Sequence, residues 1–190
     1  MTTALVYGSV RSDRKGIRAA LFLRKQLEVR GHKVHFIDPL VDSLPLLDKM
    51  YKEYKGNDAP ETMEKIAGWL READGFIIVT GEYNHSIPPA LKNILDHFQE
   101  EYFFKPSAIA SYSAGRFGGV RAAVHLRVIL AELGTPSIPS ILPLPKVGST
   151  FDDSGNTEEE FIHKSTKKFL DEYEWYLSAL KTQREKGKPY

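Results

Sequence analysis

Residues 4–16 read A-L-V-Y-G-S-V-R-S-D-R-K-G, a short apolar run followed by a loop rich in hydroxyl and charged side chains. The apolar run from Ala4 to Tyr7 predicts a short strand that ends at Gly8. Apolar residues at helical spacing then predict a helix from about Gly16 to Arg30, which Gly31 ends. A buried strand that passes through a loop directly into a helix is the first unit of an α/β fold.

The same alternation of strand and helix continues along the chain. Further strands are predicted at Val34–Ile37, Phe76–Thr80, Ser107–Tyr112 and Ile138–Leu144. Helices are predicted around Met63–Leu70, Leu91–Phe98, Gly118–Leu133 and Phe169–Leu180. This pattern predicts a single domain over residues 1–190 with a doubly wound, five-stranded parallel sheet of order 2-1-3-4-5. Residues 181–190 are interpreted as a polar tail.

One connection, Pro39–Pro60, is long for a loop in such a fold and contains several apolar residues. Connections of this length are often lids or interface segments. A packed surface loop is the alternative, and the sequence leaves both open.

Composition narrows the classes of function. The 190 residues carry a net charge of +1, which argues against a nucleic-acid-binding face. The chain has no cysteine, so disulfides, thiol catalysis and cysteine-ligated metals are excluded. No histidine spacing indicates a metal site, and no stretch is apolar for the length of a membrane span. The first residues lack the features of a signal peptide, and we therefore expect a cytoplasmic protein that does not bind membranes.

The loop from Gly8 to Gly16 indicates a phosphate site. It enters a helix N-terminus, where free N–H groups and the helix dipole attract anions. The loop adds two hydroxyls and three cations: Ser9, Ser12, Arg11, Arg14 and Lys15. It lacks the P-loop pattern and the glycines of a dinucleotide fingerprint. A single phosphate group, as in flavin mononucleotide (FMN), therefore fits better than a pyrophosphate. A charged, solvated loop is the alternative.

Two later loops follow the third and fourth predicted strands. Residues 81–89 read G-E-Y-N-H-S-I-P-P, and residues 111–119 read S-Y-S-A-G-R-F-G-G. The first could pair with a planar heterocycle through its backbone, and the glycines of the second allow close approach to a ligand. As alternatives, the first loop only shapes the turn and caps the next helix, and the second is a flexible loop between strand and helix. In a sheet of order 2-1-3-4-5 the strands before all three loops are adjacent, so the loops converge on one crevice.

The motifs G-S-V-R, E-Y-N-H-S-I-P-P-A-L-K-N and S-Y-S-A-G-R-F-G-G resemble the NADPH-dependent FMN reductase family over roughly residues 4–145. This family has a flavodoxin-like fold and includes flavin, quinone, azo-dye and chromate reductases. The resemblance implies an FMN phosphate held by Ser9, Arg11, Ser12, Arg14 and Lys15, with Ile17 at the helix start. It implies that Glu82, Tyr83, Asn84 and His85 line the isoalloxazine, and that Ser113, Gly115, Phe117 and Gly118 close the other side. Two positions depart from the family pattern, because many relatives have proline at Gly81 and serine at Arg14.

The resemblance implies an NAD(P)H-dependent oxidoreductase in which hydride passes through bound FMN to a quinone, flavin, azo or metal-oxyanion acceptor. Donor and acceptor would alternate in a ping-pong cycle, and no side chain would be catalytic because flavin N5 carries the chemistry. NADPH is the preferred donor, with Arg116 and Arg121 as nearby cations. A flavodoxin-like electron carrier and an FMN-bound redox sensor are the alternatives. Apolar residues on more than one face of the helix at 118–133 predict a homodimer or homotetramer.

Overall fold

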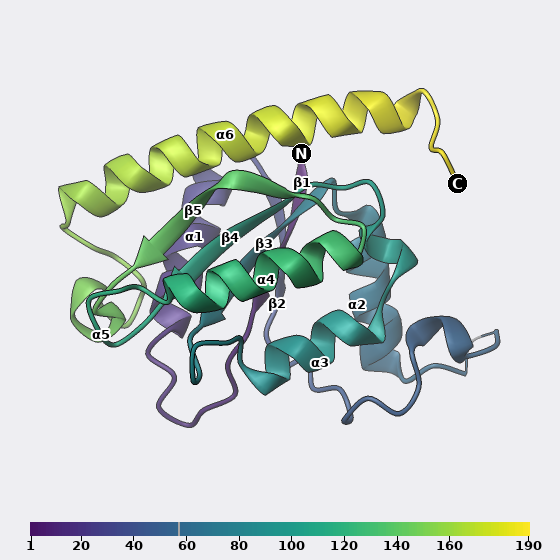
Figure 1. The fold of residues 1–190 in the computed structure, drawn as a ribbon, viewed down its shortest axis with the longest axis horizontal. Coiled ribbons are helices and arrows are strands. Elements are labelled where there is room, and N and C mark those ends of the chain that lie inside the picture. The colour runs from purple at the N-terminus through teal and green to yellow at the C-terminus, as the bar shows by residue number, and fades with distance from the viewer. Residues whose placement is uncertain (57) are drawn as a thin grey trace.

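The computed structural model describes residues 1–56 and 58–190, and its centre is a five-stranded parallel sheet (Figure 1). The strand order is β2-β1-β3-β4-β5, as the sequence predicts. The strands are β1 (Thr2–Tyr7), β2 (Lys33–Ile37), β3 (Gly75–Gly81), β4 (Ser107–Tyr112) and β5 (Ser137–Leu144). All four neighbouring pairs are parallel, so their carboxyl ends share one edge of the sheet. The flavodoxin-like fold is therefore confirmed.

Helices cover both faces of this sheet (Figure 1). They are α1 (Ile17–Val29), α2 (Glu61–Glu72), α3 (Pro89–His97), α4 (Val120–Glu132), α5 (Val147–Thr150) and α6 (Glu160–Glu185), with 3₁₀ turns η1 (Tyr51–Glu53) and η2 (Glu100–Tyr102). One core joins α2, α3 and α4 to alternate strand residues such as Val6 and Ile78. The other joins α1 and α6 to the intervening residues, such as Leu5 and Ile77. Both faces of the central strands are thus buried, which explains their continuous apolar runs.

The main differences from the predicted elements lie at the carboxyl end of the chain. The final helix begins at Glu160 and continues to Glu185, so residues 181–185 are helical and the prediction of a tail from residue 181 is wrong. Arg184 donates to the carbonyls of Phe104 and Asp74 at 3.0 and 3.1 Å, and Lys181 pairs with Asp74 at 3.0 Å. Because these contacts are polar, the sequence of residues 181–185 has no apolar periodicity that would predict a helix there. The other helix ends differ from the predictions by only a few residues, and α5 was not predicted.

The segment 39–60 packs against the helical face that contains α2 and α3. Leu44, Tyr51 and Tyr54 pack against the core on that side. Asn93 of α3 holds the backbone, because its side chain accepts from Leu47 N at 2.9 Å and donates to Pro45 O at 2.8 Å. Residue 57 lies outside the described residues. The segment is therefore packed over much of its length.

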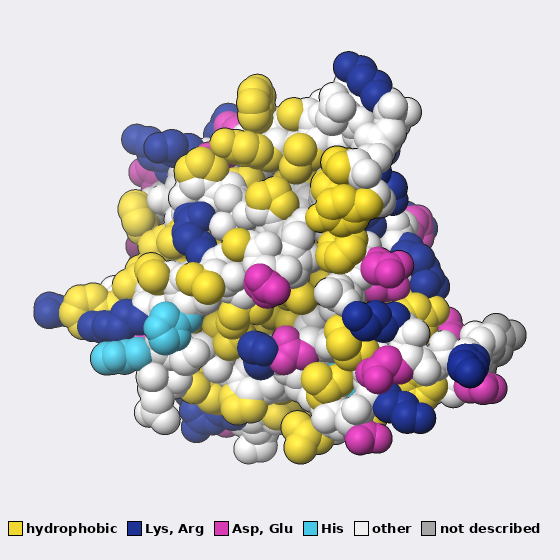
Figure 2. All heavy atoms as spheres, turned by 45° about the vertical axis from the view of Figure 1, so that its right-hand side comes forward, with side chains coloured by type: hydrophobic (Ala, Val, Ile, Leu, Met, Phe, Trp, Pro, Cys, Tyr) yellow, Lys and Arg dark blue, Asp and Glu magenta, His cyan; other side chains and the backbone are white. Residues whose placement is uncertain are grey.

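The surface mixes both signs of charge. Figure 2 shows lysines and arginines between acidic and hydrophobic side chains, without a continuous basic face on the side in view. Within residues 1–56 and 58–190, no helix has the length and apolar character that crossing a membrane requires.

Candidate functional site

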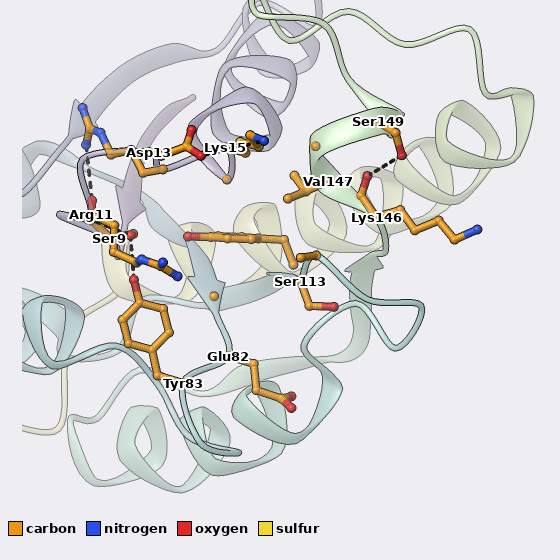
Figure 3. Close-up of a pocket in the computed structure, with 16 residues that line it drawn as sticks. Ser9, Arg11, Asp13, Lys15, Glu82, Tyr83, Ser113, Lys146, Val147 and Ser149 are labelled. Atoms are coloured by element: carbon orange, nitrogen blue, oxygen red, sulfur yellow. Dashed lines mark hydrogen bonds and ion pairs between the residues drawn. The ribbon is translucent and has the colours of Figure 1, made fainter.

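A cavity of about 550 Å³ lies at the carboxyl edge of the sheet (Figure 3). Its walls come from the loops that follow β1, β3, β4 and β5. Seven residues proposed from the sequence line it: Ser9, Arg11, Arg14, Lys15, Glu82, Tyr83 and Ser113. The predicted convergence of three loops on one crevice thus agrees with the structure. A volume of this size falls within the range of small-molecule and cofactor sites.

The other proposed residues lie near the cavity but are not part of its lining. They are Ser12, Ile17, Asn84, His85, Gly115, Phe117 and Gly118. Asn84 and His85 have positive φ angles of 49° and 67°, and the flanking residues Tyr83 and Ser86 exchange backbone hydrogen bonds of 2.9 and 3.0 Å. This is the pattern of a tight hairpin turn. Both central side chains are exposed, so their local role is to shape the turn that presents Tyr83.

Ser9, Arg11 and Tyr83 form one wall of the cavity. The Ser9 and Tyr83 hydroxyls are 2.9 Å apart, which joins the loop after β1 to the loop after β3. The Ser9 hydroxyl also accepts from Arg11 N at 3.4 Å. Figure 3 shows Arg11 beside the Ser9–Tyr83 contact and Lys15 farther along the same loop. These side chains place two cations and a hydroxyl close to the N-terminus of α1.

Arg14 has a partner within the protein. Its guanidinium donates to the Asp38 carboxylate and, at 3.3 Å, to the carbonyl of Ser9. Asp38 follows β2 and is buried. The hydrogen bond that Arg14 donates to the Asp38 carboxylate raises the pKa of Arg14, so this arginine stays charged. The direct phosphate contact expected of Arg14 therefore competes with an ion pair that the sequence did not reveal.

The Glu82 side chain is also engaged within the protein. Its carboxylate accepts from the backbone N–H of Arg121 at 3.0 Å and of Ala122 at 3.4 Å, and it contacts the Arg121 guanidinium at 3.3 Å. A carboxylate at these free N–H groups caps α4 and matches the helix dipole. Glu82 therefore connects the loop after β3 to α4, and only its backbone and stem remain for a ligand.

Tyr112, which is absent from the residues predicted to bind the cofactor, also lines the cavity. Its ring packs beside Tyr7 with a centroid separation of 6.0 Å, and the two hydroxyls are 3.2 Å apart. A Cβ at Gly16 would lie 2.1 Å from the Tyr112 ring, and a Cβ at Gly81 would lie 3.0 Å from its hydroxyl. Burial raises the pKa of both tyrosines, so they remain protonated hydroxyls at neutral pH. The glycine at residue 81 thus leaves room for this ring.

The glycines at 118 and 119 serve chain packing. Both have positive φ angles, 62° and 76°. A Cβ at Gly118 would lie 2.9 Å from Pro143 Cβ, and one at Gly119 would lie 2.6 Å from the carbonyl of Tyr112. The backbone at Gly118 therefore lies close to β5, and a larger residue at position 118 would first displace the end of that strand.

A fourth wall, residues 146–149, was missed from the sequence. Lys146 has a positive φ of 48°, and its N–H donates to the Gly115 carbonyl at 3.0 Å. Arg18 of α1 holds the same segment through the carbonyl of Gly148 at 2.9 Å. Because this loop follows a strand of the parallel sheet, its position in the sequence could have indicated that it borders the cavity. Asp13, Gly16, Gly81, Tyr112 and Ala114 complete the lining residues that the sequence analysis did not select.

Comparison with known proteins agrees with this geometry. Residues 1–148 match the model of the NADPH-dependent FMN reductase family. The chain belongs to this family. The match includes the loops after β1, β3 and β4 and most of the fourth wall.

Individual relatives have reductase names. A 2-hydroxy-1,4-benzoquinone reductase from Burkholderia is 32% identical over 90% of this chain and 92% of its own length. A quinone reductase from Escherichia coli K12 is 39% identical, but the match spans only 50% of this chain and 52% of the relative. The solved structure of FerB, a flavoenzyme NAD(P)H:(acceptor) oxidoreductase from Paracoccus denitrificans, covers 94% of this chain and 97% of its own, with a TM-score of 0.77 and 24% identity. This last likeness shows the fold.

Proposed function

We propose that the protein is an FMN-dependent oxidoreductase that uses NAD(P)H to reduce small-molecule acceptors. The observation that carries the proposal is the cavity at the carboxyl edge, which combines Ser9, Arg11 and Lys15 with the N-terminus of α1. A chain of the FMN reductase family would place a phosphate at such a group of donors.

The residues present fit FMN. Ser9, Arg11 and Lys15 would hold the phosphate, and Tyr83, Tyr112 and Ser113 would border the ring system. Backbone groups of residues 82–85 would supply hydrogen bonds, in the place that the family motif indicates. Bound FMN would supply the redox chemistry by passing two electrons from a nicotinamide to an acceptor. The protein's part is to hold the cofactor, exclude water from one side and leave the other side open.

Quinones are the proposed acceptor class, with azo compounds and free flavins as further candidates. The named relatives include quinone reductases and an NADPH azoreductase from Bacillus, which is 28% identical over 76% of this chain. The proposed donor is NADPH, whose 2′-phosphate would pair with a cation such as Arg116 or Arg121. The proposal places this reaction in the cytoplasm.

We expect ping-pong kinetics, because one cavity would serve donor and acceptor in turn. The measurement is a matrix of initial rates with varied NADPH and a benzoquinone. Parallel double-reciprocal lines are the expected result. Intersecting lines would require both substrates to bind at once and would contradict the single-cavity mechanism.

Sustained turnover separates this proposal from its alternatives. A flavodoxin-like carrier or a redox sensor would become reduced once and then stop, whereas a reductase consumes NADPH steadily while acceptor remains. A single reduction of the bound FMN, with no further NADPH consumption when an acceptor is present, would favour the carrier or the sensor.

We also propose a homodimer or homotetramer. Val124 and Val128 on α4 are 58% and 73% exposed, and Leu46 in the segment 39–60 is 87% exposed. Exposed apolar side chains on α4 and on the segment 39–60 support this proposal. Light scattering at micromolar concentration is expected to give at least twice the 21.5 kDa chain mass. The variant Val128→Asp should shift the mass toward the monomer, whereas Val29→Asp, at an equally exposed valine on α1, should not. A monomer mass for the unaltered protein would contradict the proposal.

A further inference from the structure

The ion pair of Arg14 and Asp38 has no part in the proposed reaction, although Arg14 itself lines the cavity. The Arg14 side chain is 15% exposed and that of Asp38 is 8% exposed. Arg14 belongs to the phosphate loop, whereas Asp38 follows β2 and lies outside the cavity lining. The pair therefore connects the proposed ligand loop to a residue outside the cavity lining.

We propose that Arg14 is a positioning residue that shapes the phosphate loop through Asp38, and is not itself a phosphate ligand. This inference rests on the proposed function, because it concerns the FMN phosphate. Arg14 donates to the Ser9 carbonyl at 3.3 Å, and Ser9 in turn orients Tyr83 and the N–H of Arg11 through its hydroxyl. The Arg14 guanidinium thus fixes the backbone of Ser9, whose hydroxyl contacts the other two residues of this cavity wall.

The pair is itself held from several sides. The Arg14 guanidinium lies over the Tyr7 ring, 5.5 Å from its centroid. The backbone N–H of Asp38 donates to Asp42 at 3.0 Å, and Asp42 pairs with Lys65 of α2 at 2.5 Å. A guanidinium engaged by a buried carboxylate, a carbonyl and a ring would have to break these contacts to reach a ligand. Breaking the pair is unfavourable, because it would leave the buried Asp38 carboxylate without its cationic partner.

Replacement of Asp38 distinguishes a phosphate-ligand role of Arg14 from a positioning role, because the two roles predict opposite changes in FMN affinity. If Arg14 were a phosphate ligand, Asp38→Asn would free a cation and remove a negative charge, so FMN would bind more tightly. If Arg14 positions the loop, the same change releases the loop, and FMN binds more weakly. The readout is the ratio of FMN to riboflavin affinity, measured on apoprotein by the quenching of flavin fluorescence. A general loss of stability lowers both affinities and leaves this ratio unchanged.

For Asp38→Asn and for Arg14→Met we expect the ratio to fall about tenfold, the lower end of what loss of an orienting partner costs a ligand group in metal sites. The double variant is expected to be no worse than either single variant, because both disrupt the same contact. The control pair is Arg24 and Glu28, an exposed arginine–carboxylate pair on α1. Arg24→Met and Glu28→Gln should leave the ratio unchanged.

A rise in the ratio for Asp38→Asn, or additive losses in the double variant, would overturn the inference. If Asp38→Asn does not fold, Asp38→Glu provides the same comparison, because it keeps the charge but moves the carboxylate. A severalfold fall is then expected, and an unchanged ratio would contradict the positioning role. If the unaltered protein binds neither flavin, or binds both equally, the proposed function fails instead.

Discussion

Replacement of Arg11 by alanine is expected to weaken FMN binding about tenfold or more and to leave riboflavin binding nearly unchanged. Arg11 lines the cavity beside Ser9 and, unlike Arg14, forms no ion pair within residues 1–56 and 58–190. A charge-assisted hydrogen bond contributes roughly 1.5–3 kcal/mol, which corresponds to that change in affinity. Riboflavin lacks the phosphate and should not respond.

The two affinities are measured by titrating apoprotein with each flavin. Arg116→Ala is the matched control, because Arg116 is an exposed cation of the loop after β4 that does not line the cavity. Its effect on both flavins should be small. Equal losses for FMN and riboflavin in Arg11→Ala would show that Arg11 does not contact the phosphate.

Replacement of Gly16 by alanine is expected to destabilise the protein by about 1–3 kcal/mol, the usual cost of overfilling a packed site. Gly16 has ordinary helical backbone angles, φ −61° and ψ −18°, so alanine introduces no backbone strain. The new Cβ would lie 2.1 Å from the Tyr112 ring, which is buried against Tyr7 and Gly81. Either the ring or the start of α1 must move, and flavin affinity should fall with it.

A double-variant cycle isolates this contact. In a Tyr112→Ala background the ring is absent, so Gly16→Ala should be harmless there. Gly68→Ala is the control, because Gly68 lies inside α2 and a Cβ there would meet nothing within 4 Å. That variant should gain about 0.5–1 kcal/mol from helix propensity. Free energies of unfolding come from denaturant titration. Equal costs of Gly16→Ala in both backgrounds would contradict the packing account.

The features of the fold that sequence could predict are those that depend on apolar periodicity. The residues of β3 are all buried, and Phe76–Thr80 is accordingly the most strand-like run in the chain. Strand order followed from the alternation of elements, because right-handed crossovers limit the arrangements of a parallel sheet. The place of the cavity followed in turn, since adjacent parallel strands bring their loops to one edge.

The features that were missed depend on contacts between residues distant in sequence. Nothing in the sequence near Arg14 indicates that its guanidinium would pair with Asp38, which follows β2. In the sequence, Tyr112 is simply the last residue of a predicted strand. Its place in the cavity depends on the absence of a Cβ atom at Gly16 and at Gly81. The end of α6 is fixed by Arg184 and backbone carbonyls, which have no periodic signal.

The proposed function requires that the chain bind FMN and that NADPH reduce the bound FMN. The most direct measurement is the visible absorbance spectrum of the purified, FMN-loaded protein, recorded without oxygen before and after NADPH is added. We expect a flavin spectrum at one FMN per chain that NADPH bleaches and a quinone restores. A protein that retains no flavin after gel filtration, or a bound flavin whose spectrum NADPH leaves unchanged, would contradict it.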